Sequence, residues 1–544
     1  MRTIGAEEQR IIEAEAAQTG IPTLLLMEQA ARAVADLTLK LLSSGNYPSV
    51  SILCGAGNNG GDGYAAARLL LDHAPVLRLY ESASAADNQG DAHLNRQACL
   101  KLGMVPHLLQ EFTPGPGLII DAVFGSGFKA DRLVSPEFRS LAKAVNAARA
   151  YYQACVLSVD LPSGIEASSG RASESVITAD ETLTFILPKT GLVSYPGRKF
   201  AGRVTVSDLG LPASFLEKIW IDKNLHSPSA LTESDVRSWK PERAPDCHKG
   251  NFGRLAILAG SPGLAGAAVL SGQAAMRTGT GYVYLTVPSE IYPAVLAAAP
   301  SLLTSTLPNS TSEEHLPDAG ISARRISDMQ LAFWRERMQG MDAVLVGPGL
   351  GLPDAARPDL ISLILAAIQE APRLVLDADA LNLLAVPNKL ETYREVLQKR
   401  TQSGLEPAIL TPHPGEFARL CPEAADLVEQ DRIRSARLLA KLANSVVVLK
   451  GAGTVMAFPT DGETWINTSG NVGMAKAGSG DVLGGLLGAL LAQGLPLKQA
   501  VSSAVYLHGL AADIQSKHRT YRALAPEDTL AGLPAAFRQV GWED

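Results

Sequence analysis

Residues 470–492 read GNVGMAKAGSGDVLGGLLGALLA, a glycine-rich loop followed by a long apolar run. Gly478-Ser479-Gly480 leaves backbone N–H groups free at the start of the predicted helix, which is an anion-binding arrangement. The loop ends on a carboxylate, Asp481. No G-x-x-x-x-G-K-[ST] occurs in the chain, so this is not a P-loop nucleotide hydrolase. Asp481 either caps the helix or accepts a hydroxyl proton as a phosphoryl group arrives.

Four other predicted strand ends carry turns with polar or glycine residues. They are VGPGLG with Gly349 and Gly351, LVLDADA with Asp377 and Asp379, TPHPGE with His413, and VVVLKGAGT with Lys450 to Thr454. Each turn taken alone fits simple chain reversal or helix capping. In an open parallel sheet these ends meet at one edge, where ligands bind. Together they indicate one site, and they favour the catalytic reading of Asp481.

Short β-branched runs alternate with amphipathic helical stretches along the whole chain, which predicts parallel sheets covered by helices. One set of strands runs from SVSILC to RVTVSDL, and a second begins at GRLAILAGS. We therefore expect two α/β domains, residues 1–220 with a Rossmann-like doubly wound sheet and residues 221–544. Residues 227–250 read as a connector. Thr304 to Asp328, rich in Ser, Asn and Pro, is predicted to be an irregular surface insertion.

Composition excludes several classes of protein. A net charge of −7 over 544 residues gives no basic footprint for nucleic acid or an anionic membrane. The five cysteines are scattered without a C-x-x-C, which argues against zinc and disulfides. The N-terminus is too acidic for a signal peptide, and the longest apolar run, Val482–Ala492, is too short for a membrane helix. We expect a cytoplasmic homo-oligomer with small-molecule ligands.

A second glycine loop, CGAGNNGGDGY, spans Cys54–Tyr64 between a predicted strand and a predicted helix. Its glycines fit the dinucleotide pattern G-x-G-x-x-G, and Glu81 follows about 20 residues later. Asp62 disturbs that interpretation, because a carboxylate there would compete with phosphate for the same N–H groups. Asp62 is either a helix cap or part of a site.

Two neighbouring strand ends favour a site. IIDAVFGSGFKAD ends a strand on Asp121 and continues into a glycine turn that carries Lys129, and VLSVDLPSG ends a strand on Asp160 with Ser163 in the turn after it. Three strand ends of one doubly wound sheet would then bring polar side chains to its carboxyl edge.

These motifs, Asn58 to Gly63, Asp121 with Phe124 to Gly127, and Asp160 to Gly164, resemble the NAD(P)H-hydrate epimerase family, as does IPTLLLMEQAARAVA. The resemblance implies a potassium ion on oxygens of Asn59, Asp121 and Ser163, which suit a hard cation. It implies Asp160 and Lys129 as the proton-transfer groups, with Asp160 as the base. The implied contacts of the hydrated dinucleotide are Asn58, Asn59, Gly60, Gly61, Asp62, Gly125, Ser126, Gly127, Phe128, Lys129, Ala130, Asp131 and Asp160.

The Gly-Ser-Gly-Asp loop, together with Asn471 to Ala475 and HKGNFGRLAILAGSPGLAGAAVLSGQAAMRTGTG, resembles the ribokinase-like fold and, within it, the ADP-dependent NAD(P)H-hydrate dehydratases. The resemblance implies Mg²⁺ and ADP, with Asp481 as the catalytic base. The implied nucleotide contacts are Lys450, Gly451, Ala452, Gly453, Thr454 and Gly480. The implied hydrate contacts are Ala267, Gly349, Gly351, His413 and Asp481.

The two resemblances together imply a repair enzyme for hydrated NADH and NADPH. Its first domain would interconvert the R and S hydrates, and its second would dehydrate the S form with ADP, giving NAD(P)H, AMP and phosphate. Two rival functions remain open here. The second domain could be a ribokinase-like kinase for a vitamin or sugar, and the first could be a dinucleotide sensor without chemistry.

Overall fold

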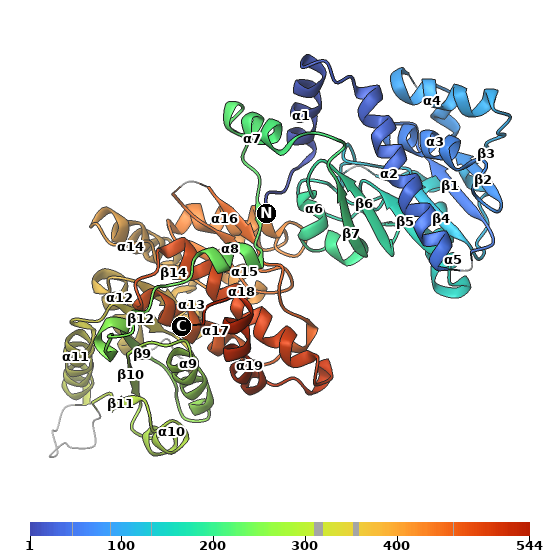
Figure 1. The fold of residues 1–544 in the computed structure, drawn as a ribbon. Helices are drawn as coiled ribbons and strands as arrows, with labels where there is room; N and C mark the ends of the chain where they lie inside the picture. Colours follow the sequence, from blue (N-terminus) through green and yellow to red (C-terminus); the bar gives the residue numbers. More distant parts are fainter. Residues whose placement is uncertain are drawn as a thin grey trace. The chain divides into compact units, whose positions relative to one another are not determined.

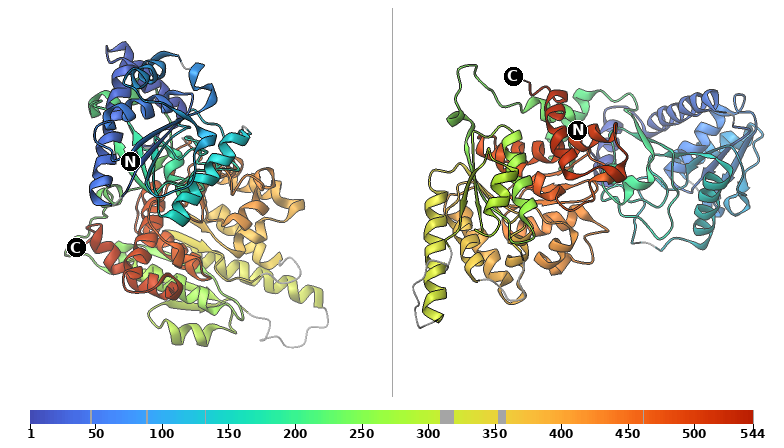
Figure 2. Two further views of the ribbon diagram at one scale, coloured as in Figure 1. Left: turned by 90° about the vertical axis from the view of Figure 1, so that its right-hand side faces the viewer. Right: turned by 90° about the horizontal axis from the view of Figure 1, so that it is seen from below.

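The structure is a computed structural model that describes residues 1–45, 47–87, 89–131, 133–308, 319–351, 358–460 and 462–543. The chain forms two compact units, Arg2–Ser229 and Ala230–Asp544, the latter joined by Met1. Each unit has its own sheet with helices on both faces (Figures 1 and 2). The predicted class, two α/β domains, is confirmed.

The N-terminal unit contains a seven-stranded parallel sheet in the order β3-β2-β1-β4-β5-β6-β7. The order reverses between β1 and β4, which is where open α/β sheets form a ligand crevice. The strands are β1 Val50–Cys54, β2 Leu77–Glu81, β3 His107–Leu108, β4 Leu118–Ala122, β5 Cys155–Val159, β6 Glu181–Phe185 and β7 Arg203–Ser207.

Apolar side chains on alternate positions of these strands enter two cores, as expected for a sheet covered on both faces. Ile52 and Cys54 belong to the core beneath α2 and α3, whereas Leu53 belongs to the core beneath α5. The helices are α1 Ala6–Gln18, α2 Thr23–Ser44, α3 Asn58–Leu70, α4 Gly90–Lys101, α5 Pro136–Tyr152, α6 Thr190–Val193 and α7 Ala213–Asp222.

The C-terminal unit has a ten-stranded sheet in the order β11-β10-β9-β12-β13-β14-β15-β16-β17-β8. The pairs from β11 to β15 are parallel, and β16 pairs antiparallel with both of its neighbours β15 and β17. The strands are β8 Ser229–Ala230, β9 Arg254–Leu258, β10 Tyr282–Val287, β11 Leu303–Thr306, β12 Ala343–Val346, β13 Leu374–Leu376, β14 Ile409–Leu410, β15 Val446–Leu449, β16 Val455–Ala457 and β17 Thr464–Ile466.

Helix α17 (Ser479–Ala492) contains the apolar run that follows the Gly-Ser-Gly-Asp loop, and its residues from Val482 onward are buried. It packs closely on α9, because a Cβ at Gly485 would lie only 2.2 Å from the Ser271 carbonyl oxygen. The remaining helices are α8 Glu233–Ser238, α9 Ala265–Arg277, α10 Tyr292–Ala298, α11 Ala319–Met338, α12 Pro358–Glu370, α13 Asp379–Leu384, α14 Leu390–Gln402, α15 Pro414–Leu420, α16 Arg432–Ala443, α18 Leu497–Ser516 and α19 Pro526–Gln539.

Several short strands were not predicted from the sequence. Strands β3, β8, β11, β16 and β17 have two to four residues each, too few for a clear periodic pattern. The irregular insertion expected over Thr304–Asp328 is wrong at residues 304–306, which belong to β11, and from Ala319 onward, where α11 begins; positions 309–318 lie outside the described residues. Of the helices in the described ranges, none combines the length and apolar character needed to cross a membrane.

Candidate functional site

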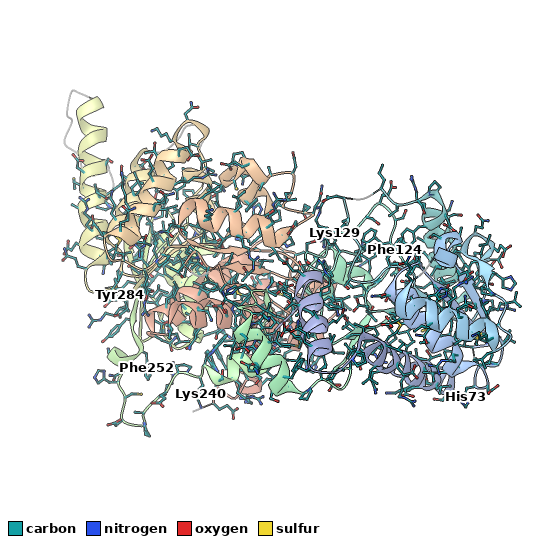
Figure 3. All side chains as sticks on the ribbon, turned by 90° about the horizontal axis from the view of Figure 1, so that it is seen from above. His73, Phe124, Lys129, Lys240, Phe252 and Tyr284 are labelled. Atoms are coloured by element: carbon teal, nitrogen blue, oxygen red, sulfur yellow. The ribbon has the colours of Figure 1, made fainter. Side chains whose placement is uncertain are left out.

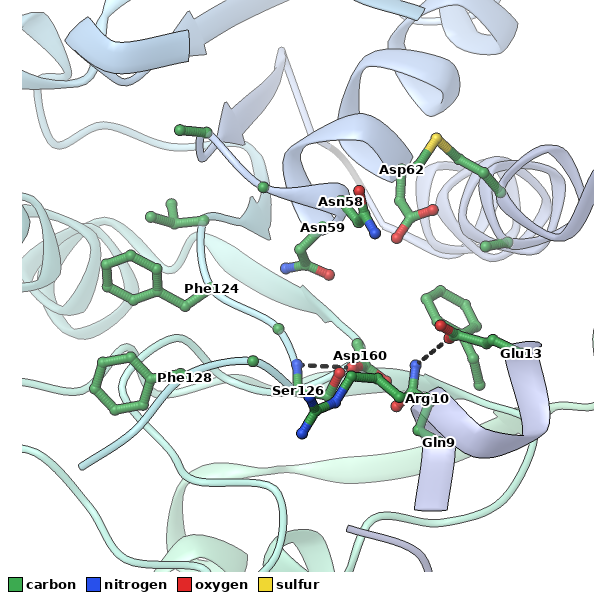
Figure 4. A pocket seen from close by; sticks show the side chains of 18 of the residues that line it. Gln9, Arg10, Glu13, Asn58, Asn59, Asp62, Phe124, Ser126, Phe128 and Asp160 are labelled. Atoms are coloured by element: carbon green, nitrogen blue, oxygen red, sulfur yellow. Dashed lines mark hydrogen bonds between the residues drawn. The ribbon is translucent and has the colours of Figure 1, made fainter. Parts of the chain in front are cut away.

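The N-terminal unit holds a cavity of about 570 Å³ at the carboxyl ends of its strands. Its walls come from α1, α2, the first turns of α3, the loop after β4 and the loop after β5 (Figure 4). Of the predicted substrate contacts, the cavity is lined by Asn58, Asn59, Asp62, Gly125, Ser126, Gly127, Phe128, Lys129 and Asp160. Gly60, Gly61, Ala130 and Asp131 do not line it.

The glycines of the first loop serve the packing of α3. A Cβ at Gly60 would lie 1.9 Å from the Gly55 carbonyl oxygen, and one at Gly63 would lie 2.7 Å from the Cys54 Sγ. Helix α3 begins at Asn58, after Gly57, so Asp62 lies in its second turn and the prediction that Asp62 caps the helix is wrong. Burial and the charge of Asp160 raise the pKa of Asp62 well above its usual value.

The pairing of Glu81 argues against the plain dinucleotide-binding fingerprint. Its carboxylate accepts two hydrogen bonds from Arg96, at 2.8 and 2.7 Å, and one from the Tyr64 hydroxyl at 2.8 Å. A ribose would have to displace this partly buried pair. Glu81 therefore supports the fold of the unit and does not line the cavity.

Asp121 and Ser163 form a buried hydrogen-bonded group at the carboxyl edge of the sheet, and Asn59 is buried in the first turn of α3. The Asp121 carboxylate accepts hydrogen bonds from the Ser163 hydroxyl at 2.6 Å, the Ser163 N–H at 2.9 Å and the Ser158 hydroxyl at 2.9 Å. Burial raises the pKa of Asp121. Both polar side-chain atoms of Asn59 are buried without a hydrogen-bond partner. A buried amide oxygen without a partner and a buried carboxylate are both oxygen ligands of the kind that a hard cation prefers.

Asp160 sits at the centre of a second buried group. It is 4% exposed and has a left-handed backbone, with φ of 67°. Its carboxylate accepts hydrogen bonds from the Ser126 N–H at 3.1 Å and the Thr184 hydroxyl at 3.2 Å, and it pairs with Lys189 at 2.7 Å. A non-glycine residue in this region costs about 1–3 kcal/mol and often marks a functional site.

Sequence reasoning missed Lys189, which follows β6 in FILPKTG and is fully buried. Its ammonium also donates to the Phe185 carbonyl at 2.8 Å. A lysine just after a buried strand, at the same sheet edge as Asp160, was the signal that could have revealed it. Lys129 has a different position, exposed at the surface and 3.4 Å from Glu166 (Figure 3). Asp131 is exposed and pairs with Arg171.

The C-terminal unit brings the predicted strand ends together around Lys450. Its ammonium pairs with Asp377 at 2.7 Å and lies 3.8 Å from Glu416. The Thr411 hydroxyl also donates to Asp377, at 2.6 Å. Burial opposes the charge on Lys450, but the negative charges of Asp377 and Glu416 outweigh this effect and raise its pKa. Asp377 is therefore an ion-pair partner at this edge and not the helix cap that turn chemistry allowed.

Asp481 lies at the third position of α17, two residues after the helix begins at Ser479. Gly478 is the N-cap residue, and no side chain makes a capping hydrogen bond. The capping interpretation of Asp481 is therefore wrong. Burial, followed by the negative charge of Asp377, raises the pKa of Asp481 to about 7. A carboxylate with that pKa can accept a proton near neutral pH.

The remaining predicted positions surround this group. A Cβ built on Gly480 would lie 3.4 Å from the Lys450 ammonium, and one on Gly349 would lie 2.8 Å from the Ala267 Cβ. The Gly351 N–H donates to Asp379 at 2.8 Å. Gly451 and Gly453 have φ of 140° and 59°. The turn from Lys450 to Thr454, which contains Ala452, therefore has a backbone conformation that favours glycine.

His413 is the N-cap of α15, and its Nδ1 accepts hydrogen bonds from the N–H groups of Gly415 and Glu416 at 3.0 and 3.4 Å. Burial and the positive charge of Lys450 lower its pKa. The ring is therefore neutral near pH 7. Its Nε2 lies 3.4 Å from Glu416.

These features define a two-domain α/β protein with a small-molecule cavity in one unit and a buried carboxyl group of raised pKa at the start of a glycine-bearing helix in the other. Two family models match the chain, the YjeF-related protein N-terminus over residues 23–191 and NAD(P)H-hydrate dehydratase over residues 255–534. The chain belongs to the family of bifunctional NAD(P)H-hydrate repair enzymes. This confirms the predicted family.

Curated relatives match nearly the whole chain. The bifunctional NAD(P)H-hydrate repair enzyme Nnr of Moorella thermoacetica is 36% identical over 96% of this chain and 93% of its own length. The Nnr enzyme of Escherichia coli is 33% identical over 89% of this chain and 84% of its own length. Among solved structures, the ADP/ATP-dependent NAD(P)H-hydrate dehydratase of Bacillus subtilis is 29% identical, covering 57% of this chain and 99% of its own, with a TM-score of 0.46.

Proposed function

We propose that this protein repairs hydrated NADH and NADPH in the cytoplasm with both of its units active. The N-terminal unit interconverts the R and S hydrates. The C-terminal unit dehydrates the S hydrate with ADP and returns NAD(P)H, AMP and phosphate. Family membership supports both activities. The observation that carries the mechanism is the position of Asp481, two residues into α17, with a pKa raised to about 7.

In the C-terminal reaction Asp481 takes the proton of the hydrate hydroxyl while ADP transfers its terminal phosphoryl group to that oxygen. The N–H groups at the start of α17 and the Lys450 ammonium hold the nucleotide phosphates. Mg²⁺ bound with the nucleotide would neutralise phosphate charge. The phosphorylated hydrate then loses phosphate, a far better leaving group than hydroxide, and a proton leaves the neighbouring ring carbon to solvent, so that the ring double bond forms again. The turn from Lys450 to Thr454 is the proposed nucleotide contact.

In the N-terminal reaction the hydrate occupies the cavity with its reacting ring near Asp160. Asn59, Asp121 and Ser163 would hold K⁺, which supplies a fixed positive charge at the sheet edge. The orphaned oxygen of Asn59 and the buried Asp121 carboxylate support this ligand set. Asp160 is the proposed base. Lys129, exposed and paired with Glu166, is placed at the cavity rim as a contact for substrate phosphate.

The test follows NADH absorbance from a mixed pool of R and S hydrates with the full chain and Mg²⁺, in three samples with ADP, with ATP or without nucleotide. Recovery of the whole pool with ADP supports both activities. Recovery of only the S fraction would remove the epimerase assignment. Absence of any nucleotide-dependent recovery would remove the dehydratase assignment.

The rival kinase function is not favoured by the family match. It predicts that a phosphorylated vitamin or sugar accumulates as a stable product, which mass spectrometry of the reaction mixture would detect. The rival sensor function predicts that the N-terminal unit binds the hydrate without converting pure R hydrate into the S form.

A further inference from the structure

Helix α1 brings a carboxyl group to the N-terminal cavity that no motif in the sequence had indicated. Gln9 and Glu13 lie one turn apart and both line the cavity. The Gln9 amide N–H donates to the Glu13 Oε1 at 2.8 Å, and Figure 4 shows this pair at the wall formed by α1. The Gln9 amide oxygen is buried without a partner. A carboxyl group held by a neutral amide therefore lines the space where the substrate would sit.

The surroundings of Glu13 raise its pKa. Burial is the largest cause and the negative charge of Asp160 adds to it, while the hydrogen bond from Gln9 and the charge of Lys189 act in the opposite direction. Asp62 approaches from α3, with its own pKa raised by burial, Asp160 and Glu13. Arg10 on α1 also lines the cavity, as do Asp91 on α4 and Lys129 after β4.

Asp160 lies in a different environment from Glu13. It has an ammonium partner and two hydrogen-bond donors, all of which stabilise a negative charge. Glu13 has one neutral amide donor. Two carboxyl groups in one cavity, one paired with an ammonium and the other buried with a single neutral donor, form a typical acid and base pair. This arrangement differs from the predicted pair of Asp160 and Lys129, because the Lys129 ammonium is exposed and held by Glu166.

We propose that Glu13 is the acid of the epimerisation, a proposal that rests on the N-terminal activity above. Water adds to the enamine double bond of the reduced nicotinamide ring, so the hydroxyl stands on the carbon next to the ring nitrogen. Glu13 gives its proton to that hydroxyl, the C–O bond breaks, and water departs. The nitrogen lone pair forms the C=N bond of an iminium ion.

Water then adds to the other face of the iminium carbon and gives a proton to Asp160, while the C=N π electrons return to nitrogen. One turnover moves one proton from Glu13 to Asp160. The reverse reaction uses the two carboxyl groups in the opposite roles, and both re-equilibrate with solvent between turnovers.

The test measures conversion of pure R hydrate to S hydrate by the full chain, without ADP and with K⁺, by chromatography from pH 5 to 9. Four variants are compared with the parent, Glu13→Gln, Glu13→Asp, Asp62→Asn and Glu15→Gln. Glu15 lies on the same helix and pairs with Lys223 at 2.6 Å, so it is the matched control outside the cavity. Urea unfolding of the full chain, followed at the transition that ADP does not shift, checks that the N-terminal unit of each variant is folded.

Glu13→Gln is expected to lower kcat on the order of 10²–10⁴-fold with KM changed by less than about threefold. The parent should lose activity as pH rises through the raised pKa of Glu13, and this alkaline limb should vanish from the residual activity of Glu13→Gln. Glu13→Asp should recover part of kcat, and Glu15→Gln should match the parent.

An active Glu13→Gln variant, or one that loses activity but keeps the alkaline limb, would overturn the assignment. A loss confined to Asp62→Asn would also overturn it and move the role to Asp62. A parent chain that does not convert R hydrate to S hydrate would instead refute the epimerase function itself. The two failures are therefore distinguishable.

Discussion

The substitution Asp481→Asn should stabilise the C-terminal unit at the same time as it inactivates it. Burial and the charge of Asp377 raise the pKa of Asp481 from 3.8 to about 7. Asparagine keeps the shape of the side chain and removes the charge. No side-chain capping bond is lost, since Gly478 is the cap. The substitution therefore removes the free-energy cost of holding a buried negative charge at position 481.

The sign and size follow from proton linkage. A carboxyl group whose pKa is raised on folding costs stability above its unfolded pKa, because the folded state holds a charge that it disfavours. The cost is absent below about pH 4, grows by about 1.4 kcal/mol per pH unit up to about pH 7, and stays near 4 kcal/mol above that. The variant should therefore gain about 2–3 kcal/mol more at pH 8 than at pH 5.

The assay is urea unfolding of the full chain at pH 5 and pH 8, using the transition that ADP shifts to higher urea, because a ligand stabilises the unit that binds it. In parallel, ADP-dependent dehydration should fall on the order of 10²–10⁴-fold, about 3–5 kcal/mol of barrier. A stability gain that does not change with pH would refute the raised pKa. Dehydration within tenfold of the parent would refute the role of Asp481 as base.

Three further predictions follow from the ion-pair and oxygen-ligand groups. Asp121→Ala should abolish epimerisation and spare dehydration, because the cation loses an anionic ligand; an unchanged response to K⁺ titration would contradict this. Lys450→Ala should raise KM for ADP more than it lowers kcat, which steady-state kinetics would check. It should also lower the free energy of unfolding by about 3–5 kcal/mol, because buried Asp377 loses its partner, and urea unfolding would measure this loss. In the parent, dehydration should fall as pH drops through about 7, where Asp481 becomes protonated. Asp377→Asn should move this limb of the kcat/KM profile to lower pH, and a shift to higher pH would show that Asp377 is not its cause.

Both sheets and the edges that carry the sites were predictable from the sequence. Buried parallel strands such as β1 and β4 read as unbroken apolar runs, and the polar residue that ends each run marks the ligand edge. Strands β16 and β17 were not predicted from the sequence. Each has only three residues, which is too short for a periodic pattern to be recognised. The sequence predicts later starts for α3 and α17 than the structure has. The first turns of both helices contain glycine, and glycine normally indicates a loop.

Residues of the candidate sites could be predicted only where they lie in a recognisable sequence motif. Asp121 and Asp160 each lie at the end of a strand before a recognisable turn, and Asp481 follows a glycine loop. Glu13 lies in an ordinary amphipathic helix among other acidic residues, and only the tertiary packing of α1 against the sheet edge separates it from exposed Glu7. The pKa of Asp481 also depends on Asp377, 104 positions earlier in the chain. Charge effects over such separations leave no local signal in the sequence.

The left-handed backbone of Asp160 bears on how this protein can change over evolutionary time. At that position glycine would relax the backbone, so selection for catalysis and selection for stability act in opposite directions on one codon. A lineage that no longer needs epimerisation gains by losing Asp160, but only if buried Lys189 is replaced as well, because an unpaired ammonium in that core is costly. Loss of activity should therefore appear as paired substitutions at 160 and 189, a footprint that separates decayed members of the family from working ones.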